Sequence, residues 1–98
     1  MKVLVEVDFE EKSGLKERII MICNEIDSKY PGKSMFRFKT SKLLGLSQLK
    51  LWQFYGEINH LEAKKFLIKK YGEIIIPREN VIKESPGAPS QRPDTSGI

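Results

Sequence analysis

The stretch Thr40-Ser41-Lys42-Leu43-Leu44-Gly45-Leu46-Ser47 constrains the fold of this chain more than any other. It holds two hydroxyl residues suited to capping helix N-termini, with a glycine between them that can take the positive φ of a helix C-terminus. The pattern predicts a very short helix over 41–44, capped by Thr40 and ended by Gly45, and a second helix over 48–63 that Ser47 caps. Two helices joined by such a turn form a helix-turn-helix. By 3.6-residue arithmetic one face of the second helix is shared by Leu51, Phe54, Tyr55, Ile58, Leu61 and Glu62, and we take Leu51 as the centre of the buried face.

The flanking segments predict one more helix and several strands. Alternation of apolar residues predicts a strand over 2–9 and a short one within 35–39. Between them, apolar residues at three- and four-residue steps predict a helix over 14–29, with Ser13 as N-cap and Pro31-Gly32 as its stop. After the helix-turn-helix, two β-rich runs flank Tyr71-Gly72 and favour a hairpin over 66–77, although a single helix continuing to Lys70 is the alternative.

The strand over 2–9 needs a cover for its apolar face, and its edge needs a partner. It should join the 66–77 hairpin as a third strand or pair with a second copy across a two-fold axis, and we favour the intramolecular sheet. Ninety-eight residues support one hydrophobic core, so we expect one domain over 1–83. The remaining residues, 84–98, are rich in Pro, Gly and Ser and should form a disordered tail.

Charge is concentrated in the middle of the chain. The net charge is +4, but residues 32–83 carry eleven bases against four acids, and no acid occurs between Asp27 and Glu57. A positive field of this kind attracts polyanions, although an ordinary solvated surface is the plain alternative. The single Cys, the acids near the N-terminus and the lack of a long apolar run indicate a cytoplasmic protein, and the excess of Lys, Glu and Ile leans toward a thermophile.

The helix-turn-helix stretch resembles that of the winged helix-turn-helix DNA-binding proteins, whose second helix and turn typically read Ala-x-x-Leu-Gly-Leu-Ser. Leu44, Gly45, Leu46 and Ser47 match this pattern, whereas Ser41 stands where alanine is usual. The resemblance covers roughly 14–80 and implies a small α+β domain of order β-α-β-α-α-β-β, with the helix over 48–63 in the major groove and the hairpin as a wing. The strand over 2–9 and the aromatic run Trp52-Gln53-Phe54-Tyr55-Gly56 depart from the family pattern.

The resemblance implies a double-stranded DNA interface on the outer side of the second helix, at its start and on the wing. With Leu51 at the buried centre, Gln53, Gly56 and His60 point outward, with Leu49, Lys50 and Glu57 beside them and Trp52 on the flank. Gln and Lys can bond base edges, whereas Glu57 would repel phosphate unless it accepts from a cytosine amine. The solvated side of a core helix is the alternative. The candidate DNA-binding residues are Lys39, Ser47, Gln48, Leu49, Lys50, Trp52, Gln53, Gly56, His60, Lys64, Lys65, Lys69, Lys70 and Tyr71.

The resemblance implies that the chain binds DNA as a small transcriptional regulator or a chromatin-associated protein. Two other functions are alternatives to DNA binding. A protein interaction module of replication, repair or transcription assemblies would use Leu49, Trp52, Phe54 and Tyr55 as hot spots, with the chain a monomer or a homodimer. Catalysis finds little support, because His60 is the only His and no metal, cofactor or phosphate-loop spacing occurs. Asp8, Glu10 and Glu11 could hold a divalent cation, but a solvated chain segment explains them better, so we expect no enzyme, cofactor or metal.

Overall fold

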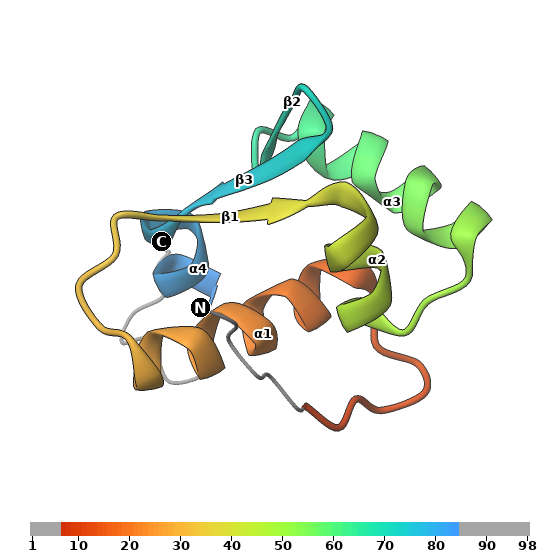
Figure 1. Ribbon diagram of the computed structural model, residues 1–98. Coiled ribbons are helices and arrows are strands. Elements are labelled where there is room, and N and C mark those ends of the chain that lie inside the picture. The colour runs from red at the N-terminus through yellow and green to blue at the C-terminus, as the bar shows by residue number, and fades with distance from the viewer. Residues whose placement is uncertain (1–6, 85–98) are drawn as a thin grey trace, which may run out of the picture.

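The computed structural model describes residues 7–84 and shows a small α+β fold with four helices and a three-stranded antiparallel sheet. In chain order the elements are α1 (Leu15–Lys29), β1 (Met35–Lys39), α2 (Thr40–Ser47), α3 (Leu51–Ala63), β2 (Ile68–Lys70), β3 (Glu73–Pro77) and α4 (Arg78–Glu84). Figure 1 shows the sheet lying above α1, with α2 and α3 at one end of the molecule and the turn between α1 and β1 at the other. None of the described helices is long and apolar enough to cross a bilayer.

The sheet has the order β1-β3-β2, so the strand in the middle is the last one in sequence. β3 pairs with β1 from Met35↔Pro77 to Lys39↔Glu73 and with β2 from Ile68↔Ile75 to Lys70↔Glu73. The hairpin and the strand within 35–39 are therefore confirmed, whereas the predicted third strand is wrong over residues 7–9, which lie outside the sheet. β1 takes that place instead, because its own apolar alternation lets it bury Phe36 and Phe38. Residues 2–6 of that predicted strand lie outside the described residues.

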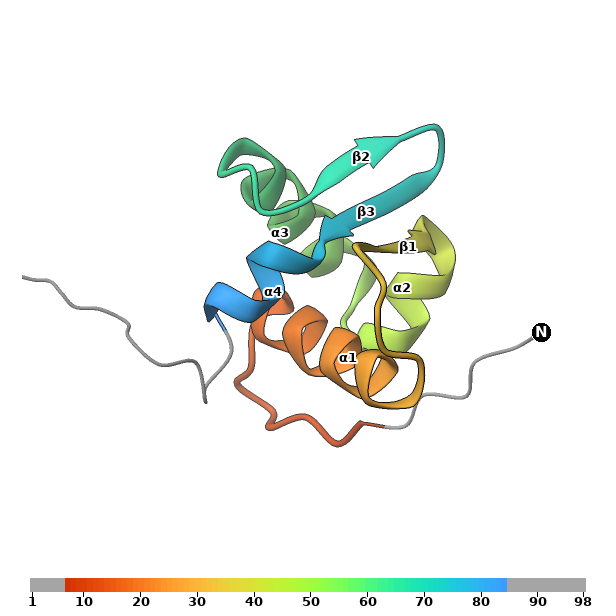
Figure 2. The same cartoon turned by 90° about the vertical axis from the view of Figure 1, so that its left-hand side faces the viewer.

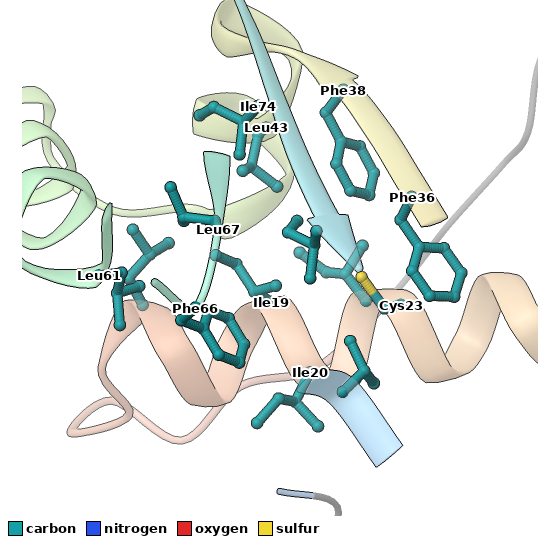
Figure 3. Close-up of a cluster of buried hydrophobic side chains, with 14 of the residues drawn as sticks. Ile19, Ile20, Cys23, Phe36, Phe38, Leu43, Leu61, Phe66, Leu67 and Ile74 are labelled. Atoms are coloured by element: carbon teal, nitrogen blue, oxygen red, sulfur yellow. The ribbon is translucent and has the colours of Figure 1, made fainter. Parts of the chain in front are cut away.

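The hydrophobic core lies between α1 and the inner face of the sheet. Ile19, Ile22 and Cys23 of α1 are fully buried, and Ile74 and Ile76 of β3 are buried from the opposite side. Figure 3 shows side chains from α1, β1, α2, β3 and the end of α3 converging on this space. Burial raises the pKa of the Cys23 thiol far above its ordinary range, with a smaller contribution from the Asp27 carboxylate, so Cys23 is a core residue and not a nucleophile.

Helix α4 was not predicted from the sequence. It follows Pro77 directly and buries Val81 against the core, and α4 packs against α1 and β3. The Arg78 guanidinium reaches the Asp27 carboxylate of α1 at 3.1 Å, and the Arg78 backbone N–H donates to the Ser34 carbonyl. Because α4 runs to Glu84, it extends one residue into the predicted tail, and the rest of that tail, 85–98, lies outside the described residues.

Candidate nucleic-acid interface

The turn between α2 and α3 is formed by Gln48 and not by Gly45. Helix α2 continues through Gly45 to Ser47, and Gln48 takes the left-handed conformation at φ 60°. The prediction that Gly45 ends a helix over 41–44 is therefore wrong, and so is the prediction that Thr40 caps it, since Thr40 is the first residue of α2. The Thr40 N–H and hydroxyl both donate to the Gly72 carbonyl, at 2.9 and 3.0 Å, which ties the start of α2 to the tip of the hairpin.

Ser47 lies inside the molecule. Its hydroxyl donates to the Leu44 carbonyl at 2.8 Å and accepts from the Leu49 N–H at 3.3 Å, and the residue is fully buried. The expected cap on the second helix is wrong, because α3 begins at Leu51 with Lys50 in the N-cap position. Ser47 therefore fixes the turn from within and does not lie on the candidate surface. Gln48 is exposed and its amide nitrogen donates to the Val7 carbonyl at 3.4 Å.

Helix α3 is rotated relative to the sequence prediction. Its buried residues are Phe54, Ile58 and Leu61, whereas Leu51 is 59% exposed, so Leu51 is not the centre of the buried face. The helix begins three residues later than predicted, and its first turn lies at the edge of the core. At 100° per residue, the side opposite Phe54 and Ile58 carries Trp52, Gly56, Asn59 and Ala63, all exposed. Asn59 was missed, because the misplaced centre put it on a flank.

Glu57 faces α1 and not the solvent. One carboxylate oxygen accepts the Leu15 N–H at 2.7 Å, and the other accepts the Gln53 side-chain amide at 2.9 Å. A carboxylate at a helix N-terminus satisfies a free N–H and offsets the positive end of the helix dipole. Ser13 is therefore not the cap of α1: Gly14 takes that position, and its N–H donates to the Glu17 carboxylate. The expectation that Glu57 faces outward is therefore wrong, and the Gln53 side chain is bonded within the protein.

His60, Lys64 and Lys65 line a cleft between the C-terminal end of α3 and the first turn of α1. Lys65 takes φ 64° after the helix ends, and the Phe66 N–H donates to the Leu61 carbonyl at 3.0 Å, as in a Schellman motif. The Asn80 amide of α4 donates to the carbonyls of Lys65 and Phe66, at 3.3 and 2.8 Å. These bonds hold the corner that carries the two lysines, on the side of α3 that contains Glu57 rather than on its outward side.

The hairpin brings Lys69 to α3, and its tip carries Tyr71 and Gly72. Figure 2 shows β2 and β3 as a ribbon whose tip lies on the side of β1 and α2, where the Gly72 carbonyl accepts from Thr40. Tyr71 and Gly72 at that tip both have positive φ, 51° and 76°, as a type I′ hairpin turn requires, and Tyr71 is 96% exposed. The Lys69 ammonium donates to the Asn59 carbonyl oxygen at 3.0 Å, which joins the hairpin to the outward side of α3.

The remaining lysines of the predicted site are exposed, but only Lys50 adjoins α3. Lys50 precedes the helix, and Lys39 and Lys70 each pair with Glu73 in the sheet register, on either side of β3. Glu73 itself contacts Arg37 at 3.4 Å. Within residues 7–84, no side-chain carboxylate forms an ion pair with any of the following lysines: Lys39, Lys50, Lys64, Lys65 and Lys70.

The residues predicted for a protein interaction site are divided by the fold. Trp52 is 75% exposed and Tyr55 is 42% exposed, and both lie on α3 next to exposed Leu51. Phe54 is fully buried and packs edge-to-face against Tyr55, so it cannot be a hot spot, and Leu49 is partly buried against the core. The described residues contain no cluster of three or more His, Cys, Asp or Glu that could hold a metal ion, so Asp8, Glu10 and Glu11 do not form one.

Comparison with known proteins does not identify a family for this chain, because no protein-family model, curated protein or solved structure matches it.

Proposed function

We propose that this chain is a winged helix-turn-helix protein that binds double-stranded DNA, as a small transcriptional regulator or a chromatin-associated protein. Support comes from the element order α1-β1-α2-α3-β2-β3 and the sheet order β1-β3-β2, which are compatible with that fold. In this proposal α3 enters the major groove and the hairpin from Ile68 to Pro77 lies along the backbone as a wing.

The distribution of charge around α3 carries the proposal. Exposed lysines without carboxylate partners flank both ends of the helix and the hairpin, while the one acid on the inner flank, Glu57, is bonded to the N-terminus of α1. The surface that α3 and the hairpin share is therefore basic at its margins, and the carboxylates near it are those of exposed Glu62 on α3 and of Glu73, which contacts Arg37. Duplex DNA carries one negative charge per about 1.7 Å of its axis, so such margins would supply its phosphate contacts.

The proposal is tested by the salt dependence of binding to a random-sequence duplex. We expect log K to fall linearly with log salt, and replacement of Lys64, Lys65 and Lys70 by Gln should reduce the slope by about 0.9 for each phosphate that the variant no longer neutralises. The control is the double variant Lys29→Gln, Lys33→Gln, at the end of the molecule away from α3 (Figure 1), which should keep the original slope. Absence of salt-dependent binding in the wild-type protein would contradict the proposal.

A protein interaction module is the second candidate, and the exposed apolar side chains of α3 favour it. Leu51, Trp52 and Tyr55 are exposed neighbours on one side of α3, and contiguous exposed apolar side chains are typical of protein contact sites. If this surface binds a protein, Trp52→Ala should abolish a pull-down from cell extract that resists nuclease, because an aromatic anchor can contribute about 2 kcal/mol or more to an interface. Trp52 is largely exposed, so this variant should keep the fold, which circular dichroism checks.

A further inference from the structure

The outward side of α3 is neutral, although lysines surround it. Trp52, Gly56, Asn59 and Ala63 occupy this side, and α3 as a whole contains no Lys or Arg. The cations lie before the helix, after it and on the hairpin, where they would meet the backbone of a duplex rather than its bases. The part of the helix that would face the groove floor therefore offers one aromatic ring, one amide and a bare stretch of backbone.

These groups match the edge of one kind of base pair. Guanine is read in the major groove by Arg or Lys, and cytosine by a carboxylate, neither of which stands on this side. Adenine is read by the amide of Asn or Gln, and the thymine methyl is met by apolar side chains. We propose that α3 reads A·T base pairs in the major groove, with Asn59 on adenine and Trp52 against a thymine methyl. This inference rests on the proposed DNA-binding function.

Lys69 is a positioning residue for this readout. Its ammonium donates to the Asn59 carbonyl oxygen at 3.0 Å, across from the hairpin. That oxygen has a second lone pair, so it can still accept from the adenine amine while the amide nitrogen donates to the adenine ring nitrogen N7. The contact orients the amide before DNA arrives, which lowers the entropy cost of binding. Lys69 thus acts through Asn59, in contrast to the phosphate contact expected from the sequence.

Gly56 lies between Trp52 and Asn59 and has no structural reason to be glycine. It lies within α3 without positive φ, and a Cβ added there would meet no protein atom within 4 Å. Glycine is the least favourable residue in a helix interior apart from proline, so the protein gives up stability at this position. The bare backbone allows the groove floor to approach the helix between the two reading side chains.

The spacing of the reading residues gives the size of the site. Trp52 and Asn59 are seven residues apart, which is about 10 Å along a helix and corresponds to about three base pairs. The proposal therefore predicts a preference for a run of about three A·T pairs.

Four duplexes of equal length and equal flanks test the readout, with cores of A·T pairs, G·C pairs, A·U pairs and inosine·C pairs. Deoxyuridine removes only the thymine methyl, and inosine·C keeps the major-groove edge of G·C while its minor groove resembles that of A·T. We expect the A·T core to bind at least about fivefold more tightly than the other three at one salt concentration. Equal binding of all four would overturn the inference while leaving DNA binding intact, and inosine·C bound as tightly as A·T would assign the preference to the minor groove and overturn it too. No salt-dependent binding to any duplex would reject the proposed function itself.

Two sets of variants assign the readout to its residues. Gly56→Ala and Gly45→Ala are a matched pair, because both glycines are exposed in helices and neither has an atom within 4 Å of the new Cβ. Both should raise Tm by about 4 °C or more, but only Gly56→Ala should weaken binding to the A·T core. Asn59→Ala should reduce the preference over G·C to the part that the thymine methyl supplies and leave the preference over A·U unchanged, and Lys69→Met should reduce the preference over G·C only while Asn59 is present. Tight A·T-selective binding by Gly56→Ala, or an additive effect of Lys69→Met in the Asn59→Ala background, would contradict these roles.

Discussion

Arg18 is the residue on which the arrangement of the helix-turn-helix depends. It is 6% exposed, and its guanidinium donates to the carbonyls of Ser47 at 2.7 Å, Ser13 at 3.0 Å and Glu10 at 3.2 Å, while lying over the Phe9 ring. A buried cation satisfied by backbone carbonyls links the segment before α1 to the end of α2. We expect Arg18→Met to lower the free energy of unfolding by about 2–4 kcal/mol in urea denaturation, because the carbonyls are left without donors inside the protein.

Arg78→Met is the control for this prediction. Arg78 is partly exposed and forms an ion pair with Asp27, and such pairs contribute less than about 1 kcal/mol. Equal effects of the two substitutions would show that Arg18 has no special role in holding the helix-turn-helix.

Cys23 gives the protein a specific alkaline sensitivity. Burial raises the pKa of its thiol in the folded state, while in the unfolded chain the thiol ionises near about 8.5. Below that pH the thiol is protonated in both states and contributes no pH dependence. Above it only the unfolded chain releases the proton, so the free energy of unfolding should fall by up to about 1.4 kcal/mol per pH unit. Urea denaturation between pH 7.5 and 9.5 should show this fall in the wild type and a smaller one in Cys23→Ala, and identical slopes would contradict it.

At the scale of single elements, Tyr71 at the hairpin tip is unfavourable in its turn and is not buried in the core. Tyr71 has φ 51° in the first central position of a type I′ turn, where asparagine is favoured and tyrosine is not. Tyr71→Asn should therefore raise the free energy of unfolding by about 1 kcal/mol. If Tyr71 contacts DNA, as the sequence predicts, the same variant should bind duplex more weakly despite its higher stability. Unchanged affinity in a stabilised variant would remove Tyr71 from the interface.

Elements with a strong local pattern were predictable, whereas the end of α2 and the start of α3 were not. The 3.6-residue spacing placed α1 within one residue, and the Tyr71-Gly72 turn located the hairpin. The prediction that Gly45 ends a helix was wrong because α2 continues through Gly45 to Ser47. Gly45 therefore does not use its freedom to take positive φ. The sequence did not reveal the acceptor at the start of α1, because Glu57 lies 42 residues from Leu15, whose N–H donates to it. Long-range hydrogen bonds of this kind, and the resulting rotation of α3, leave no periodic signal in the chain.

On the scale of the whole molecule, the segment before α1 forms part of the folded unit although it lies outside the sheet. Val7 and Phe9 pack against the core, the Val7 carbonyl accepts from Gln48, and the Glu10 carbonyl accepts from Arg18. Residues 7–10 therefore contact α1 and the turn that leads into α3. Their removal should loosen the helix-turn-helix as well as expose the core.

Two truncated proteins, beginning at residues 7 and 11, test this coupling, since their difference reports only residues 7–10. The shorter one lacks the Val7 and Phe9 side chains in the core and two of the carbonyl acceptors just described, so its free energy of unfolding should be lower by about 2–4 kcal/mol. Both should unfold in a single transition followed alike by far-ultraviolet circular dichroism and Trp52 fluorescence, because the segment is continuous with the one core. Equal stability of the two proteins would mean that residues 7–10 contribute nothing to folding in solution. An early transition in Trp52 fluorescence without a matching change in circular dichroism would show that α3 unfolds separately. In that case contacts with DNA, and not the rest of the fold, would hold α3 in position.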